Sequence, residues 1–172
     1  MDDHAATQHQ RARFHRQILV LGIMVLAILH SVSDAFVFEG CRAKPHHQGP
    51  VTVEEYRSRA EAFVKDTQVD VEDGVAVCRP SPGGDIYLQA SRWKWEPALI
   101  LKKGHTYTLH LSSTDVSHGF RFDPLDLNLL VVPGEEQVLD LTPNESGDFR
   151  IVCDEFCGPG HELMVGKIVV EE

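Results

Sequence analysis

The sequence is poor in positive charge and lacks repeats and covalent haem motifs. Its 172 residues contain 16 Lys and Arg against 26 Asp and Glu, a formal net charge of −10. A surface of this charge repels nucleic acid, which argues against nucleic-acid binding, and attracts cationic partners. No internal repeat or low-complexity segment is present. The Cys-x-x-Cys-His motif is also absent, which excludes covalent haem attachment of that type.

Long apolar runs are also scarce, and the one that occurs lies near the N-terminus. It is unbroken over 18–29 and resumes at 35–38 after a short polar patch. As one helix, 18–38 measures roughly 31 Å, enough to cross a hydrocarbon core of about 30 Å. A cleaved signal peptide is the alternative, but the aromatic end of the run is a poor cleavage site.

Three arginines between residues 11 and 16 precede this run and favour a cytoplasmic N-terminus. We therefore expect a single-pass protein of the inner or plasma membrane. Residues 1–17 would form a cytoplasmic tail and 18–38 the transmembrane helix. The remainder would lie on the periplasmic or outer side.

Residues 39–84 are expected to form a linker with one short amphipathic helix. The segment 41–50 has the prolines and glycine of a loop, and 71–84 is rich in turn residues. Between them, Thr52 followed by Glu55 has the spacing of a capping box, which predicts a helix over about 52–66.

From residue 85 onward the apolar residues alternate with a period of two, as in strands with one buried face. Turn residues separate many short segments, which indicates an antiparallel sandwich or barrel over 85–172. The segments predicted as strands are 86–90, 98–101, 105–112, 119–122, 127–132, 137–141, 148–153 and 166–170.

The segment 153–164 concentrates metal-binding side chains between two predicted strands. Cys153, Cys157, His161 and Met164 lie within it. Thiolate and thioether are soft ligands, and together with imidazole they suit copper. The Gly-Pro-Gly sequence at 158–160 allows the loop to turn so that Cys157 and His161 can face one metal ion.

Other sites remain possible on these residues alone. A mononuclear blue-copper site needs one cysteine and would leave the second idle. A zinc site fits the cysteine spacing but leaves Met164 unused. A disulfide between Cys153 and Cys157 leaves His161 and Met164 unexplained.

The run Cys-x-Glu-x-Cys-Gly-x-x-His-x-x-Met resembles the CuA motif of cytochrome c oxidase subunit II. The resemblance extends to 115–120, which is similar to the segment that supplies the first histidine ligand in that family. It also includes the Pro-Gly turn at 133–134 and the aromatic segment Trp93-Lys94-Trp95. In all it covers about 86–170.

The resemblance implies an all-β, cupredoxin-like Greek-key β-sandwich with a binuclear copper centre. The site residues it implies are Cys153 and Cys157 as bridging thiolates, His118 and His161 as one ligand to each copper, Met164 as a weak axial ligand, Glu155 as a ligand through its backbone carbonyl, and Trp93 as the residue through which electrons enter.

The family further implies an electron-transfer subunit of a respiratory heme-copper oxidase. It would accept electrons from cytochrome c or a similar periplasmic donor and pass them to hemes in the catalytic subunit I, where oxygen is reduced. The prediction of a single transmembrane helix makes the chain more similar to the corresponding subunit of the B-type oxidases. Glu155, however, has the side chain that A-type members use towards a magnesium ion shared with the catalytic subunit.

Two alternatives stay open at this stage. The chain could be the CuA subunit of a related nitric oxide reductase, or a copper assembly or storage protein. Cys41 and Cys78 lie in the part expected outside the cytoplasm, where they could form a disulfide or remain two separate thiols. His30 and Asp34 share one face of the predicted membrane helix, which we expect to contact the large subunit.

Overall fold

The computed structural model describes residues 17, 19–24 and 42–172. The chain divides into two units, Met1–Glu39 and Gly40–Glu172. Residues 19–24 of the first unit are helical. Within the described part of the chain, no helix has the length and apolar character needed to cross a membrane. The predicted tail and transmembrane segment fall almost wholly outside the described residues and stay predictions.

The second unit consists of strands, one α-helix and two short 3-10 helices. In chain order these are β1 (Arg42–Pro50), α2 (Val53–Thr67), β2 (Gln68–Glu72), β3 (Val75–Cys78), β4 (Asp85–Ser91), β5 (Lys94–Glu96), β6 (Ala98–Lys102), β7 (Tyr107–Ser113), β8 (His118–Phe122), η1 (Asp123–Leu125), β9 (Leu127–Val131), β10 (Glu135–Thr142), β11 (Gly147–Cys153), η2 (His161–Leu163) and β12 (Val165–Glu171).

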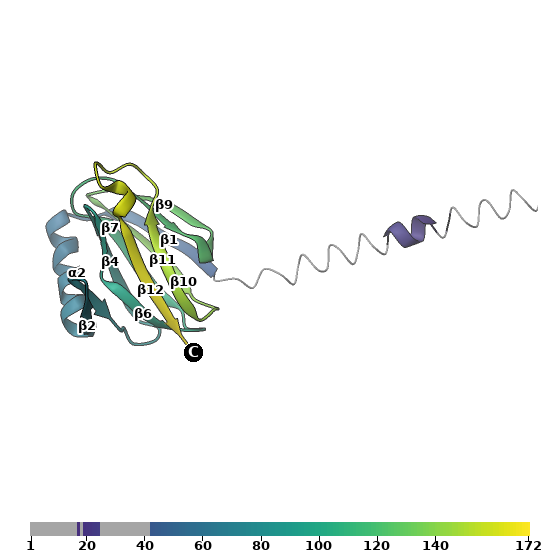
Figure 1. The fold of residues 1–172 in the computed structure, drawn as a ribbon, viewed down its shortest axis with the longest axis horizontal. Helices are drawn as coiled ribbons and strands as arrows, with labels where there is room; N and C mark the ends of the chain where they lie inside the picture. Colours follow the sequence, from purple (N-terminus) through teal and green to yellow (C-terminus); the bar gives the residue numbers. More distant parts are fainter. Residues whose placement is uncertain (1–16, 18, 25–41) are drawn as a thin grey trace, which may run out of the picture. The chain divides into compact units, whose positions relative to one another are not determined.

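The strands form two sheets that pack face to face (Figure 1). One has the order β1-β10-β7-β4-β5 and the other the order β2-β3-β6-β12-β11-β8-β9. Alternate side chains of the inner strands are buried, as the period-two pattern predicted. Large side chains that are almost fully buried include Trp95, Tyr107, Phe120, Leu99, Leu109 and Leu139.

The expectation of an antiparallel sandwich was only partly correct. β4 pairs with β7 in parallel, and β6 pairs in parallel with both β3 and β12. The reason is that the chain crosses between the sheets: β6 lies in the second sheet, so β4 and β7 meet in the first sheet after a crossover. A crossover connection allows parallel neighbours, whereas a tight hairpin does not.

Three segments of the expected linker are strands. Residues 42–50, predicted as a loop, form β1, which pairs with β10 only and is therefore an edge strand. An edge strand tolerates prolines because one of its sides makes no ladder hydrogen bonds. β2 and β3 form a hairpin around Asp73-Gly74, both with positive φ. Such a turn suits the twist of a two-residue hairpin.

The predicted amphipathic helix is confirmed as α2. The Thr52 hydroxyl caps it by accepting a hydrogen bond from the Glu55 backbone N–H, at 3.1 Å. Tyr56, Ala60 and Phe63 form its buried side. The Tyr56 hydroxyl lies 2.9 Å from the backbone carbonyl oxygens of both Leu88 and His110, and its one O–H donor, shared between these two acceptors, holds the helix against the first sheet.

Cys78, at the end of β3, is a free thiol with no exposed surface. Burial raises the pKa of this thiol, and a hydrogen bond with Thr67 partly offsets that effect. Its suggested disulfide partner, Cys41, lies outside the described residues. The choice between a Cys41–Cys78 disulfide and two separate thiols therefore stays a prediction.

Candidate metal centre

His118 and Cys153 come together because their strands are neighbours. β8 pairs with β11 so that Cys153 lies opposite Phe120, two residues from His118. His118 has no exposed surface, and Cys153 is 3% exposed. The His118 Nδ1 atom lies 3.8 Å from the Cys153 Sγ atom.

The loop between β11 and β12 brings the other side chains to the same place, at the end of the sandwich opposite the C-terminus (Figure 1). Gly158 and Gly160 have φ values of 126° and 98°, which are readily available only to glycine, and they turn the chain back into η2. The Cys157 Sγ atom then lies 3.5 Å from His161 Nδ1 and 3.9 Å from Met164 Sδ.

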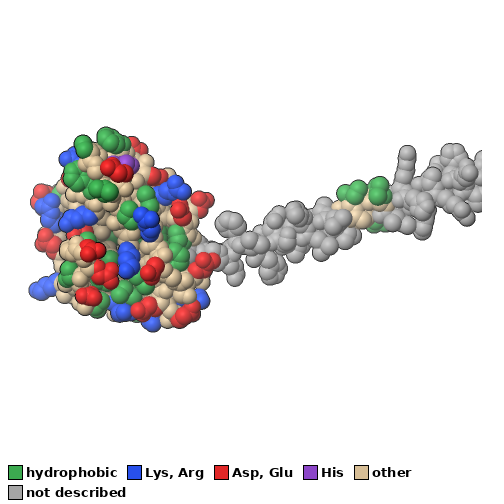
Figure 2. Space-filling model, viewed as in Figure 1, with side chains coloured by type: hydrophobic (Ala, Val, Ile, Leu, Met, Phe, Trp, Pro, Cys, Tyr) green, Lys and Arg blue, Asp and Glu red, His purple; other side chains and the backbone are tan. Residues whose placement is uncertain are grey.

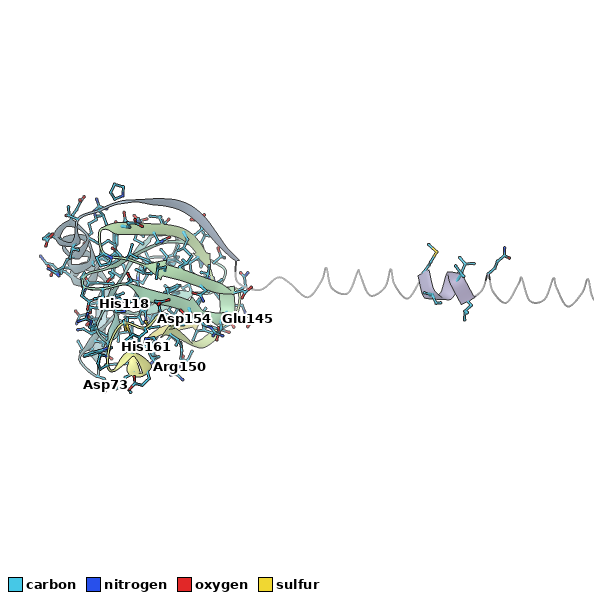
Figure 3. The ribbon with its side chains drawn as sticks, turned by 90° about the horizontal axis from the view of Figure 1, so that it is seen from above. Asp73, His118, Glu145, Arg150, Asp154 and His161 are labelled. Atoms are coloured by element: carbon cyan, nitrogen blue, oxygen red, sulfur yellow. The ribbon has the colours of Figure 1, made fainter. Side chains whose placement is uncertain are left out.

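Glu155 turns its backbone inward and its side chain outward. Its carbonyl oxygen accepts a hydrogen bond of 3.3 Å from the Cys153 thiol, while the residue as a whole is exposed. His118 and His161 lie in the same part of the domain (Figure 3). All six ligand positions predicted from the motif resemblance are thus joined by a continuous set of contacts through the two thiols.

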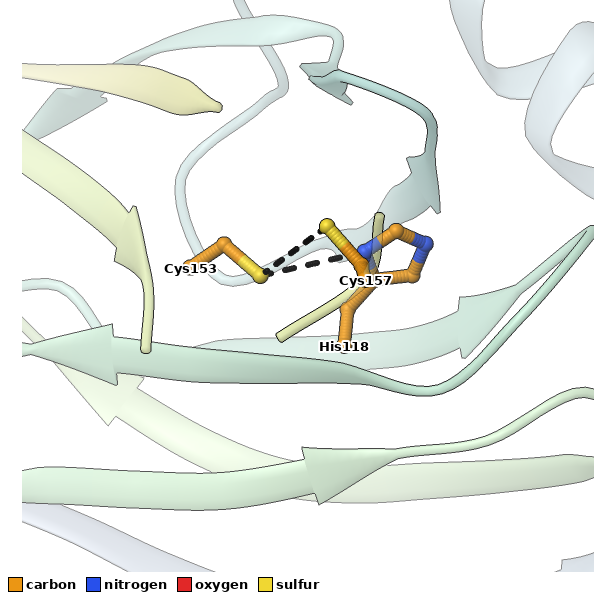
Figure 4. Close-up of side chains that lie close together, drawn as sticks. All are labelled: His118, Cys153 and Cys157. Carbon is orange, nitrogen blue, oxygen red and sulfur yellow. Dashed lines mark hydrogen bonds between the residues drawn. The ribbon is translucent and has the colours of Figure 1, made fainter. Parts of the chain in front are cut away.

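The distances fit a shared metal site. The two sulfur atoms are 3.9 Å apart, well beyond the roughly 2.05 Å of a disulfide. Two sulfur atoms that bind one metal ion at about 2.3 Å lie at most about 4.6 Å apart, so one ion could bridge them. The ligand atoms of His118, Cys153 and Cys157 lie within 4.8 Å of one another (Figure 4).

The composition of the site distinguishes between metals. All three sulfur-bearing residues (Cys153, Cys157 and Met164) are nearly fully buried and converge on one point. A tetrahedral zinc site would leave the thioether without a role, and a one-cysteine copper site would leave a buried thiol idle. Two soft thiolates with imidazole and thioether are best matched to copper.

Burial and a neighbouring thiol make Cys157 a weak acid. Burial, followed by the hydrogen bond and charge interaction with Cys153, raises the pKa of Cys157 to about 11. In the metal-free protein this thiol is therefore protonated at neutral pH. Because a thiolate is the metal-binding form, a bound metal must displace protons.

Asp115 orients His118. Its Oδ1 lies 2.8 Å from His118 Nε2, so with Nδ1 directed at the sulfur, Nε2 carries the proton and donates it. Partial burial raises the pKa of Asp115, but hydrogen bonds from His118 and from the backbone N–H groups of Arg92 and Val116 outweigh burial. The net pKa is lowered.

Exposed apolar side chains surround this end of the sandwich. Trp93 is 42% exposed, whereas Phe156 and Leu163 are each 74% exposed. Hydrophobic side chains gather at the same end in the space-filling view (Figure 2). Trp93 packs directly on the loop, since a Cβ atom at Gly160 would lie 3.1 Å from its indole ring. Gly160 immediately precedes His161. The partly exposed Trp93 side chain therefore contacts the backbone next to a predicted ligand.

Sequence reasoning missed three residues that support the site. Asp115 was noted only as part of the motif segment, although a carboxylate three residues before a ligand histidine is a recognisable signal. Gly119 allows close packing, because a Cβ atom there would lie 2.1 Å from Asp154 Oδ1. The third is Arg92, whose role depends on contacts that no local pattern indicates.

Comparison with known proteins agrees with the motif. No family model matches the chain. A cytochrome c oxidase subunit 2 from Thermus thermophilus is 35% identical over 88 residues, which are 51% of this chain and 65% of that protein. A probable cytochrome c oxidase subunit 2 from Streptomyces coelicolor is 38% identical over 74 residues, 43% of this chain and 23% of that protein. The chain thus spans less than two thirds of these relatives.

The fold is shared with a solved rusticyanin variant. The TM-score is 0.52 at 20% identity, covering 74% of this chain and 100% of that one. This agrees with the expected cupredoxin-like β-sandwich. In sequence, the chain is thus similar to proteins named cytochrome c oxidase subunit 2, the family whose motif the run from Cys153 to Met164 resembles.

Proposed function

We propose that this chain is the electron-transfer subunit of a respiratory heme-copper oxidase and holds a binuclear copper centre. The observation that carries the proposal is the convergence of four further donors on two thiols whose sulfur atoms are 3.9 Å apart. His118 Nδ1 and the Glu155 carbonyl lie on the Cys153 side, and His161 Nδ1 and Met164 Sδ on the Cys157 side.

This grouping suits two metal ions that share both thiolates. Each side offers one imidazole and one weaker donor, and the two sulfurs are common to both. Bound here, such a copper pair would supply one-electron chemistry in which the charge is spread over both ions. The chain's own contribution is to keep the donors nearly still and away from water.

The fold provides that rigidity. His118 and Cys153 sit on hydrogen-bonded strands, and a backbone hydrogen bond of 3.2 Å from Cys153 N–H to the Met164 carbonyl closes the loop. Donors held by paired strands change position little when the charge of the site changes. Little rearrangement is needed, and electron transfer is therefore fast.

Trp93 is the proposed point where electrons enter. Its indole is partly exposed and packs on Gly160, beside His161. We propose cytochrome c or a similar cationic donor, since the chain's net charge of −10 favours a cationic partner. The domain would lie on the periplasmic or outer side of the inner or plasma membrane, anchored by the predicted helix 18–38.

Electrons would leave to hemes of a catalytic subunit I, where oxygen is reduced. The relatives named above are oxidase subunits, which favours oxygen over the nitric oxide of the alternative reading. Magnesium at the subunit interface would need ligands besides the exposed Glu155 carboxylate. Among the described residues, the one group of three potential metal ligands is His118 with Cys153 and Cys157. The further magnesium ligands would therefore come from the partner subunit.

The test uses the full chain, purified in detergent and loaded with copper. We expect two copper ions per chain and a paramagnetic resonance spectrum in which one electron is shared by both nuclei. Cys157→Ser should abolish the shared spectrum, whereas Cys78→Ser should leave it unchanged because Cys78 lies outside the site. Wild-type protein that binds a single copper ion, or zinc in preference to copper, would overturn the proposal.

A further inference from the structure

Arg92, in the turn between β4 and β5, contacts both segments that carry the predicted ligands. Its backbone N–H donates a hydrogen bond of 2.9 Å to Asp115 Oδ2, and Asp115 in turn holds His118. Its side-chain Nε donates a hydrogen bond of 3.1 Å to the backbone carbonyl of Cys157. One residue therefore links the segment of His118 to the loop of the two thiols.

Two glycines of the loop lie against the turn that contains Arg92. A Cβ atom at Gly158 would lie 3.8 Å from Arg92 Nε, and one at Gly160 would lie 3.1 Å from the ring of Trp93. The turn of Arg92 and Trp93 thus packs along the backbone that follows Cys157.

The positive charge of Arg92 is opposite in sign to the charged side chains of the loop it contacts. The charged side chains of the loop itself, Asp154, Glu155 and Glu162, are all acidic and exposed. The nearby cation Lys94 is already paired with Glu96, at 2.7 Å. Arg92 instead donates to an uncharged carbonyl of a residue whose sulfur would bind metal, so its positive charge is directed at the site.

We propose that Arg92 is a positioning residue that holds the two ligand-bearing segments together, and that its charge raises the reduction potential of the copper pair bound between them. The proposal rests on the function proposed above. When one electron passes from a donor to the site, the charge of the site falls by one unit. A fixed positive charge nearby opposes the more positive oxidised state and so favours reduction.

The test compares midpoint potentials of the copper-loaded full chain. Arg92→Gln removes the charge but keeps a hydrogen-bond donor, and Arg92→Lys keeps the charge. Arg57→Gln is the matched control, because it removes one exposed cation from α2, which contributes no ligand. All are exposed positions, so the domain should fold in each variant.

We expect Arg92→Gln to lower the potential while the shared-electron spectrum persists. The equilibrium constant for electron uptake from a fixed reductant should fall by roughly two- to fivefold, the range expected for an exposed charge. The difference should shrink as salt rises from about 0.01 M to 1 M, because the Debye length falls from about 30 Å to 3 Å. Arg92→Lys should retain the potential, and Arg57→Gln should not change it.

Positioning is tested separately through copper release. Arg92→Ala removes the link to Cys157, so copper should pass to a competing chelator faster than from wild type, and Arg92→Lys should restore part of the retention. An unshifted potential in Arg92→Gln, or an equal shift in Arg57→Gln, would overturn the electrostatic role. Unchanged copper release in Arg92→Ala would overturn the positioning role. Neither result affects the proposed function, which fails if wild type binds a single copper ion or prefers zinc to copper.

Discussion

His118 Nδ1 lies 3.8 Å from Cys153 Sγ, although 35 residues separate them in the sequence. They meet because β8 and β11 are paired strands. The loop from Cys153 to Met164 carries the remaining donors, but the site is complete only when β8 is in place. The candidate metal centre is therefore a property of the folded sandwich and not of a local peptide.

Replacing Asp115 should weaken metal binding without removing a ligand. Asp115→Ala deletes the acceptor that orients His118 through Nε2. Loss of such a carboxylate typically costs about 10- to 100-fold in metal affinity. We expect a loss in this range, measured by copper competition with a chelator of known affinity.

Asp115→Asn provides the matched comparison. The amide oxygen can still accept a hydrogen bond from His118 Nε2–H. The loss of copper affinity should therefore be clearly smaller than for Asp115→Ala. Equal affinities for wild type and Asp115→Ala would show that His118 does not depend on this contact.

Gly119→Ala should disturb the loop through a steric clash. The added Cβ would lie 2.1 Å from Asp154 Oδ1 and 2.7 Å from the Glu155 backbone nitrogen. Because one neighbour is backbone, the start of the loop must move. Overpacking of this kind costs about 1–3 kcal/mol. Denaturant titration should show that loss, and copper occupancy should fall with it.

Asn128→Ala is the control for Gly119→Ala. It removes the 2.6 Å hydrogen bond that Asn128 Nδ2 donates to Asp154 but introduces no clash. We expect a smaller stability loss, about 0.5–1.5 kcal/mol, and unchanged copper occupancy. If Gly119→Ala were as stable and as well loaded as wild type, the close packing at this position would not matter to the site.

Of the strands from β4 to β12, all but β5 were predicted from the alternation of apolar and polar residues. The predicted segment 86–90 lies within β4 and 166–170 within β12, since alternation of apolar residues reports a half-buried strand directly. β1 was missed because Pro45 and Pro50 indicate a loop, and only its position at the sheet edge makes a proline-containing strand acceptable. Edge position depends on the assembled sheet, and local sequence does not report it.

Five of the six proposed ligand positions lie in a dense motif with fixed spacing, and the sixth, His118, lies in the separate segment 115–120 that resembles the same family. What the motif could not provide was the surrounding support. Arg92 and Asp115 act through contacts between separate loops, and the role of Gly119 depends on how closely β8 approaches Asp154. Those distances follow from the register of paired strands, which a motif does not contain.

An ion pair at the end of β12 should make stability depend on acid pH. Arg79 hydrogen-bonds both oxygens of Glu171, and this interaction, with help from Lys102, lowers the pKa of Glu171 below its ordinary value of 4.5. A lowered folded-state pKa contributes stability above the ordinary value, and the contribution is lost as pH falls through the folded-state pKa.

Glu171→Gln should therefore be less stable than wild type at neutral pH, and the difference should shrink as pH falls below the ordinary value of 4.5 and vanish below the lowered folded-state pKa. The effect should be small because the pair is exposed. Thermal melts across pH measure it, and Glu145→Gln, which removes an exposed negative charge before β11, controls for net charge. A difference that persists unchanged at pH 3 would mean that Glu171 acts through packing rather than charge.

Trp93 and Phe156 are both exposed aromatic residues near the site, but only Trp93 packs on Gly160 beside His161. Trp93→Ala should therefore slow electron uptake from a basic c-type cytochrome by roughly tenfold, equivalent to about 1.4 kcal/mol, because exposed tryptophans often dominate docking and this one leads to a ligand. Phe156→Ala should slow it less, since its ring lies 5.9 Å from that of His161 and points to solvent. Stopped-flow mixing of the copper-loaded full chain measures both rates. An unchanged copper spectrum and midpoint potential in each variant would establish that the site itself is intact. Equal rates for Trp93→Ala and wild type would move the point of electron entrance elsewhere on the apolar surface.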